Sequence, residues 1–258
     1  MATYKDIHGF KIQNVSSDPP TSVAGDLWYN STSGDLKVNL GTPSSAWSTG
    51  GAMNTGRYAL GSAGTQTAAL AFGGLPGSGQ TETETYNGSS WTEVNDLNTA
   101  RGYLAGSGTQ TAALAIGGSP GTKNETESWN GSNWTEVNNL NTGRSQLAGA
   151  GTQTSTIVFG GVPNLNVAET WNGTNWTEVN NLNTARHNLG GAGDSNTSAI
   201  AFGGSPGNPA TELWNGSNWT EVNNMNNGRR DLGSAGIKTA ALAFGGTPPD
   251  SGKTELWN

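Results

Sequence analysis

The feature that most constrains this chain is a repeat of 42 to 44 residues, marked by four signals that each occur five times. A tryptophan begins a short polar segment at Trp47, Trp91, Trp134, Trp176 and Trp219, and an arginine follows at Arg57, Arg101, Arg144, Arg186 and Arg229. A Gly-Gly pair ends a small apolar segment at residues 73–74, 117–118, 160–161, 203–204 and 245–246. A Glu-x-aromatic-Asn motif begins at Glu84, Glu127, Glu169, Glu212 and Glu255. Because the signals recur in register, each repeat is expected to form one unit that packs against its neighbours.

The length of the repeat matches one four-stranded blade of a β-propeller. In the first complete repeat, residues 60–64, 67–72, 82–86 and 91–94 are predicted to be its four strands. Asn87-Gly88 is a strong signal for a tight hairpin between the last two strands. The Gly-Gly pair is expected to end the second strand, where the backbone turn needs glycine. The sequence therefore predicts an all-β fold without helices.

The two ends of the repeat array are incomplete and complement each other. The first signal, at Trp47, belongs to a fourth strand, and the last, at Glu255, belongs to a third strand. We expect Ala46–Thr49 to pair beside Thr254–Trp257, so that the N-terminal strand closes the C-terminal blade. This pairing would remove two exposed sheet edges, which otherwise invite aggregation. The prediction is a closed ring of five blades.

The order of signals within each repeat resembles the Kelch motif. An apolar segment ending in Gly-Gly is followed by an aromatic residue and, five residues later, by a tryptophan, as at Trp129 and Trp134. The resemblance covers residues 46–258 and implies a five-bladed Kelch-like propeller with four-stranded blades.

A second resemblance lies before the repeats. Residues 24–38, with the sequence AGDLWYNSTSGDLKV, are followed by Ala46-Trp47. This segment resembles one found in bacteriophage tail-fibre and virion appendage proteins. Residues 26–38 also resemble a degenerate copy of the third and fourth strands of a blade, and both interpretations can hold. We expect an extended arm at residues 1–23, a hairpin-like connection at 24–45 and the propeller at 46–258.

The repeated arginines are the candidate binding residues. In the usual propeller layout, the turn that contains them lies near the central channel. There Arg57, Arg101, Arg144, Arg186 and Arg229 would form a ring able to bind carboxylates, sulfates or phosphates. The alternative is that each arginine pairs with a repeat glutamate, of which there are equally many. The tryptophans leave a similar choice between a platform for sugars and packing between blades.

An enzyme is not expected. The chain has two histidines, His8 and His187, in unlike positions and no cysteine, so no histidine cluster or thiolate site can be assembled. Glycoside hydrolysis needs two distinct carboxylates, whereas Glu93, Glu136, Glu178 and Glu221 recur in every full blade. We therefore expect no catalytic residues, no metal and no cofactor.

The charge and hydropathy of the chain limit its partners. The formal net charge is −7, and no basic cluster is present, so nucleic acid is not an expected partner. No apolar segment reaches 18 residues, so membrane insertion is not expected.

The preferred hypothesis is a non-enzymatic virion appendage or tail-fibre-type protein of a phage. Its arm would contact other virion structural proteins, and its propeller would decorate the particle or recognise a host-surface glycan or protein. The expected location is the virion, after synthesis in the host cytoplasm, and homo-oligomer formation is left open. The alternatives are a microbial cellular or secreted Kelch-like module for protein or carbohydrate binding and, from another class, a carbohydrate-active enzyme.

Overall fold

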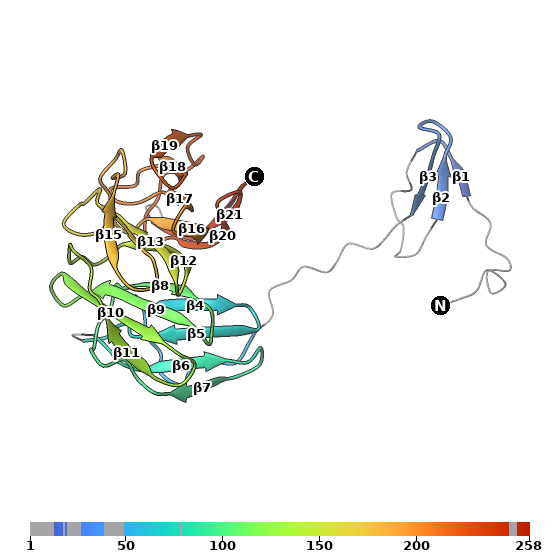
Figure 1. Ribbon diagram of the computed structural model, residues 1–258. Helices are drawn as coiled ribbons and strands as arrows, with labels where there is room; N and C mark the ends of the chain where they lie inside the picture. Colours follow the sequence, from blue (N-terminus) through green and yellow to red (C-terminus); the bar gives the residue numbers. More distant parts are fainter. Residues whose placement is uncertain (1–12, 18, 20–26, 39–48, 78, 248–251) are drawn as a thin grey trace. The chain divides into compact units, whose positions relative to one another are not determined.

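The computed structural model describes residues 13–17, 19, 27–38, 49–77, 79–247 and 252–258. The chain divides into two compact units, Met1–Thr49 and Gly50–Asn258. Every regular element among the described residues is a β-strand, which confirms the all-β prediction (Figure 1).

The first unit contains a three-stranded sheet in the order β1-β2-β3, formed by β1 (Gln13–Val15), β2 (Leu27–Asn30) and β3 (Asp35–Val38). Strands β2 and β3 form an antiparallel hairpin within the segment expected to be hairpin-like. The Asn30 Oδ1 atom accepts hydrogen bonds from the backbone N–H groups of Thr32 and Ser33, at 3.0 and 3.2 Å. Strand β1 pairs in parallel with β2 and lies within the segment expected to be an extended arm.

The described residues of the second unit form five antiparallel sheets, each built from strands that follow one another along the chain. The first sheet comprises β4 (Gly61–Thr65), β5 (Ala68–Phe72), β6 (Thr83–Tyr86) and β7 (Trp91–Val94). The second comprises β8 (Ala105–Gly108), β9 (Ala113–Gly118), β10 (Lys123–Trp129) and β11 (Trp134–Val137), and the third comprises β12 (Ala148–Thr152), β13 (Ser155–Phe159), β14 (Ala168–Trp171) and β15 (Trp176–Val179). The fourth comprises β16 (Gly190–Ser195), β17 (Ser198–Phe202), β18 (Thr211–Trp214) and β19 (Trp219–Val222), and the described part of the fifth comprises β20 (Gly233–Ile237), β21 (Ala240–Phe244) and β22 (Thr254–Trp257).

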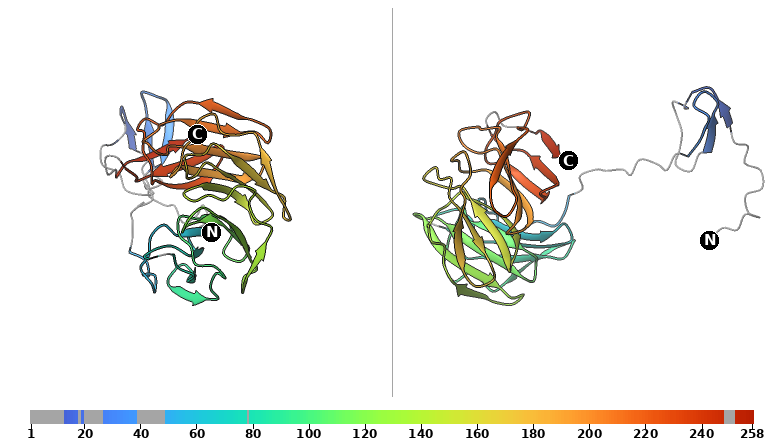
Figure 2. Two further views of the ribbon diagram at one scale, coloured as in Figure 1. Left: turned by 90° about the vertical axis from the view of Figure 1, so that its left-hand side faces the viewer. Right: turned by 45° about the horizontal axis from the view of Figure 1, so that its top comes forward.

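The five sheets of the second unit are arranged around a common centre in a propeller-like manner (Figures 1 and 2). Their first strands, β4, β8, β12, β16 and β20, follow one another as spatial neighbours. Apolar side chains fill the spaces between adjacent sheets. One such cluster joins Leu70 and Phe72 of the first sheet to Ala115, Trp129 and Trp134 of the second. The core is therefore divided into layers between sheets, as expected when each repeat packs mainly against its neighbours.

Glycine permits two features of this packing. The first strands approach each other so closely that a Cβ atom on Gly106 would lie 2.3 Å from the carbonyl oxygen of Ser62. At the end of the second strand, Gly73 and Gly74 have φ angles of 63° and 113°, in the left-handed region that favours glycine. The other four Gly-Gly pairs also have positive φ angles, as the turn prediction required.

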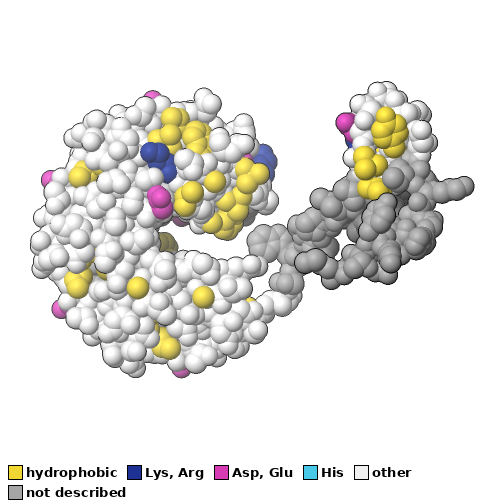
Figure 3. Space-filling model, turned by 45° about the vertical axis from the view of Figure 1, so that its right-hand side comes forward, with side chains coloured by type: hydrophobic (Ala, Val, Ile, Leu, Met, Phe, Trp, Pro, Cys, Tyr) yellow, Lys and Arg dark blue, Asp and Glu magenta, His cyan; other side chains and the backbone are white. Residues whose placement is uncertain are grey.

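Strand positions agree with the sequence prediction, since the four strands of the first sheet begin and end within one residue of the expected bounds. The predicted fourth strand of the fifth sheet is Ala46–Thr49, of which Ala46, Trp47 and Ser48 lie outside the described residues. Figure 3 shows the second unit as an open ring with a hollow at its centre.

Candidate functional site

Each predicted arginine lies in the segment that enters a sheet and forms an ion pair with a glutamate on the third strand of that sheet. The N–O distances range from 2.6 to 3.2 Å. The pairs are Arg57–Glu84, Arg101–Glu127, Arg144–Glu169, Arg186–Glu212 and Arg229–Glu255. All ten side chains have exposed fractions of 0 or 1%, apart from that of Glu255, at 15%. The structure therefore joins each arginine to a glutamate of its own sheet, which confirms the ion-pair alternative.

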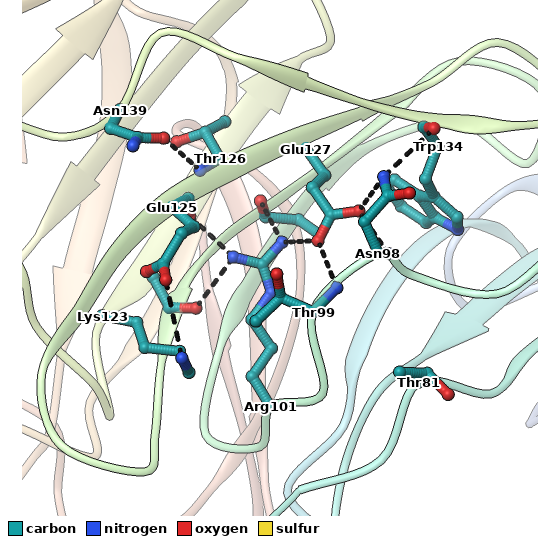
Figure 4. A network of polar contacts seen from close by, with 12 residues as sticks. Thr81, Asn98, Thr99, Arg101, Lys123, Glu125, Thr126, Glu127, Trp134 and Asn139 are labelled. Atoms are coloured by element: carbon teal, nitrogen blue, oxygen red, sulfur yellow. Dashed lines mark hydrogen bonds and ion pairs between the residues drawn. The ribbon is translucent and has the colours of Figure 1, made fainter.

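The glutamate also binds the backbone that precedes the arginine. Around Glu127, the backbone N–H groups of Asn98 and Thr99 donate to the carboxylate, at 2.8 and 3.3 Å (Figure 4). The Asn98 side chain donates to Glu127 Oε2 at 2.9 Å and to the carbonyl oxygen of Trp134 at 3.2 Å. Since Asn98 follows the last strand of the first sheet, this network fixes the connection between two sheets. It recurs around Glu84 and Glu169, and with a similar donor set around Glu212.

Electrostatics agree with a structural role for the arginines. Burial lowers the pKa of Arg101 below the ordinary value of an arginine, and the charge of Glu127 opposes this shift. Burial likewise lowers the pKa values of Arg144 and Arg186 against the effect of their glutamates. A buried guanidinium is stable only when a carboxylate and hydrogen bonds compensate it. Ligand binding by these arginines stays a prediction, and the burial of their side chains gives it no support.

The tryptophans that begin the fourth strands pack against the preceding sheet. Trp134, Trp176 and Trp219 are buried. The rings of Trp134 and Trp219 contact Phe72 and Phe159 edge-on, each with centroids 4.9 Å apart. Packing between sheets, rather than a platform for sugars, is thus confirmed for these three residues; Trp47 lies outside the described residues.

The indole N–H groups of two of these tryptophans donate hydrogen bonds to the preceding sheet. Trp134 Nε1 donates to Thr83 Oγ1 at 3.0 Å, and Trp176 Nε1 donates to Thr126 Oγ1 at 3.1 Å. Each threonine lies in the third strand of the preceding sheet. The corresponding residue for Trp219 is Ala168, and the buried Trp219 Nε1 atom has no hydrogen-bond partner among the described residues.

Sequence reasoning missed a chain of backbone hydrogen bonds around the centre of the unit. The residue two positions after each arginine has a φ angle between 52° and 56°, in the left-handed region: Ala59, Tyr103, Gln146, Asn188 and Asp231. The N–H group of each of the last four donates to the carbonyl oxygen of the preceding member, at 2.7 to 3.0 Å. A fifth bond, from Ala59 to Asp231, is not present among the described residues. The only sequence signal is the constant offset from the arginine, because the residue types differ.

A cavity of about 240 Å³ lies between the fourth and fifth sheets. Its lining includes Phe202 and Thr211 of the fourth sheet, Met225 of the connecting segment, and Ala241 and Trp257 of the fifth sheet. The side chains of Asn223, Asn224, Asn226, Glu255 and Asn258 also line it, so the cavity has both apolar and polar walls.

Other site types receive no support from the described residues. They contain no group of three or more histidine, aspartate or glutamate side chains placed to hold a metal ion. They also contain no helix that is long and apolar enough to span a membrane.

No protein-family model matches this chain, and the curated proteins include no significant match to it.

Proposed function

We propose that this chain is a non-enzymatic structural protein of a bacteriophage virion, in which a five-bladed Kelch-like propeller is displayed by an N-terminal attachment unit. The propeller would decorate the particle or bind a glycan or protein on the host surface. The observation that carries the proposal is that the repeated arginines and glutamates are buried and paired with one another. Their buried arginine–glutamate pairs fasten the segment that enters each sheet to the third strand of that sheet, which favours a rigid display scaffold over a catalytic centre.

The closed ring is part of this proposal. Ala46–Thr49 would complete the fifth sheet, and the fifth sheet would then pack against the first. The exposure of Phe244 in β21 supports this arrangement. Its exposed fraction is 39%, whereas Phe72 and Phe159, the corresponding residues of the first and third sheets, are fully buried. Ring closure would cover Phe244 with the first sheet, where Trp91 would be its partner.

The N-terminal unit supports attachment because one face of its sheet is apolar and accessible. Leu27 and Tyr29 alternate along β2, and Leu36 is the partner of Tyr29 on β3, so the three side chains share a face. Their exposed fractions are 42, 38 and 60%. Exposed apolar residues that lie together are typical of protein contact sites, and the proposed partners are other virion structural proteins.

Two measurements test this function. Mass spectrometry of purified particles of the encoding phage should detect the chain, and its absence from them would contradict the proposal. Leu36→Ser should reduce incorporation into particles, whereas the matched change Tyr58→Ser in the second unit, at the same exposed fraction of 60%, should leave incorporation unchanged. Equal incorporation of both variants would argue against attachment through this face. Turnover of a glycan by the purified chain would instead favour an enzyme.

A further inference from the structure

Each sheet of the second unit has two distinct ends. The first strand begins, and the second strand finishes, at the end that carries the repeated arginine and the Gly-Gly pair. The backbone N–H group of Leu75, next to the first Gly-Gly pair, donates to the carbonyl oxygen of Tyr58 at 2.8 Å and joins the two segments there. We call this end the arginine end. The turns between the first and second strands and between the third and fourth strands lie at the opposite end, the hairpin end.

At the hairpin end, the repeats retain a side-chain donor that links neighbouring sheets. It lies in the turn between the first and second strands and donates to the last carbonyl group of the third strand in the preceding sheet. Gln110 donates in this way to the carbonyl oxygen of Tyr86 at 2.6 Å. Gln153, Asn196 and Lys238 form the equivalent bond in the following sheets. A structural contact thus accounts for the similar residues at this end.

At the arginine end, the residue two positions after the arginine differs in every repeat. These residues are Ala59, Tyr103, Gln146, Asn188 and Asp231, all with positive φ angles. Glycine takes this conformation without steric cost, yet it occupies none of the five positions in a chain with 40 glycines. The side chains of Tyr103, Gln146 and Asn188 form no hydrogen bond with another described residue. The backbone is therefore constant here, and these side chains do not hold it in place.

The five variable residues line a pocket of about 170 Å³ to which all five sheets contribute. The leucine that follows each variable residue lines it too: Leu60, Leu104, Leu147, Leu189 and Leu232. Three of these leucines are buried, whereas the polar residues beside them are partly or fully exposed, so the pocket has an apolar base and a polar rim. Pockets for drug-sized molecules have volumes of roughly 300–1,000 Å³. This smaller pocket suits a single ring at the end of a larger ligand.

The groups on the rim match the chemistry of a neutral sugar. The amides of Gln146 and Asn188 each offer donors and acceptors, as the hydroxyl groups of a sugar require. The ring of Tyr103 is apolar on its faces and polar at its hydroxyl, so it can contact both the C–H groups and the hydroxyl groups of a sugar. Asp231 is the one charged residue of the described lining, and its ion-pair partner Arg230, at 3.4 Å, does not line the pocket. An anionic ligand is therefore disfavoured.

We infer that this pocket binds the terminal neutral sugar of a surface glycan. Gln146, Asn188 and Asp231 bond to its hydroxyl groups, and the ring of Tyr103 contacts its C–H groups. This inference rests on the proposed display function and specifies the ligand class and the site for it. The repeats supply a rigid scaffold, and one variable side chain from each repeat makes an asymmetric site in a nearly symmetric unit.

Titration of the isotope-labelled full-length chain with single sugars, followed by NMR, tests the site. The probes are the methyl glycosides of neutral hexoses and N-acetylhexosamines, with N-acetylneuraminic acid as the anionic probe. At least one neutral glycoside should shift the amide signals of Tyr103, Gln146, Asn188 and Asp231 but not that of Gln110 at the hairpin end. Shifts with the anionic probe alone, or with none of the probes, would overturn the inference.

Asp231→Ala tests the carboxylate, and alanine already occupies this position in the first repeat at Ala59. The variant should bind the same glycoside about tenfold more weakly, since hydrogen bonds to charged groups are among the stronger ones. The matched control Asp194→Ala removes an exposed aspartate at the hairpin end and should leave the affinity unchanged. Equal affinities of the two variants would argue against the site.

Gln146→Ala separates a binding role from a structural one. Its affinity for the glycoside should fall about fivefold, the effect of one hydrogen bond, while the midpoint of unfolding should stay unchanged. A lower midpoint with unchanged affinity would show a structural role and refute binding by this residue. All three tests use the isolated chain, so their failure would leave the virion proposal standing, and absence of the chain from virions would leave their results standing.

Discussion

At the scale of single residues, a buried hydrogen bond from a tryptophan indole to a threonine hydroxyl recurs between sheets but, within the described part of the chain, is missing at Trp219. Trp134 and Trp176 donate to threonine hydroxyls, whereas Trp219 meets Ala168 and lacks an acceptor among the described residues. A buried N–H group without an acceptor costs about 1–3 kcal/mol. A threonine at position 168 of the third sheet, as at Thr83 and Thr126 of the first two sheets, should therefore stabilise the protein.

Ala168→Thr tests this expectation. The hydroxyl should accept the hydrogen bond of Trp219 Nε1 and raise the free energy of unfolding by about 1 kcal/mol, measured by urea denaturation. Ala168→Val is the matched control, because valine has the shape of threonine without an acceptor. If the two variants were equally stable, the missing acceptor would not be the cause.

The buried ion pairs give a second prediction at this scale. Glu169→Gln removes the charge that compensates Arg144, and both side chains are fully buried. The variant should lose about 3–5 kcal/mol of stability, the usual cost of leaving one member of a buried pair. Glu178→Gln, at the exposed register partner of Glu169, should change the free energy of unfolding by less than about 0.5 kcal/mol. Similar losses for both variants would contradict a structural role for the pair.

At the scale of strands and sheets, the repeat signals predicted the elements well because each signal has a local cause. Glycine at positive φ ends the second strand, and Asn-Gly forms the hairpin before the fourth, so both bounds can be read from residue types. The central chain of hydrogen bonds could not be predicted in this way. Its members share only a backbone conformation, and side chains as different as Ala59 and Tyr103 occupy it. Strand β1 was missed because its pairing with β2 depends on contacts between distant segments.

The candidate site was predicted in part. The repeated arginine and the glutamate of the Glu-x-aromatic-Asn motif each occur five times, which indicated ion pairs, and the structure shows them. The hydrogen bonds of Asn98 to Glu127 and Trp134 join segments 29 to 36 residues apart, so they become visible only once the sheets are assembled.

The contribution of the fifth sheet to the free energy of unfolding should depend on pH through the carboxyl group of Glu255. Burial raises the pKa of this carboxyl, but the backbone N–H group of Asn226 and the charge of Arg229 outweigh that effect, so its pKa is lowered from the reference value of 4.5. A group with a lowered pKa in the folded state stabilises it above the unfolded pKa and loses that contribution as the pH falls through the folded pKa. The stability difference between the wild type and Glu255→Gln should therefore shrink as the pH falls below about 4.5. Equilibrium denaturation across this range measures it, and a difference independent of pH would contradict the contribution of Glu255.

At the scale of the whole molecule, the chain comprises two units with different surfaces. The first presents an accessible apolar face on a small sheet, and the second is a scaffold of stacked sheets with buried charges. The proposed closure of this scaffold by Ala46–Thr49 would turn a row of sheets with two open edges into a ring without edges. A closed ring would also keep the proposed display surface rigid.

The amide of Ala59 provides the most direct measurement of closure. Four members of the central chain of hydrogen bonds, Tyr103, Gln146, Asn188 and Asp231, donate to the preceding member. In a closed ring, Ala59 would complete the circle by donating to the carbonyl oxygen of Asp231. Native-state hydrogen exchange should then show the Ala59 amide protected to a similar degree as the other four. Exchange of Ala59 at the rate of an unprotected amide, with the other four protected, would contradict the closed ring.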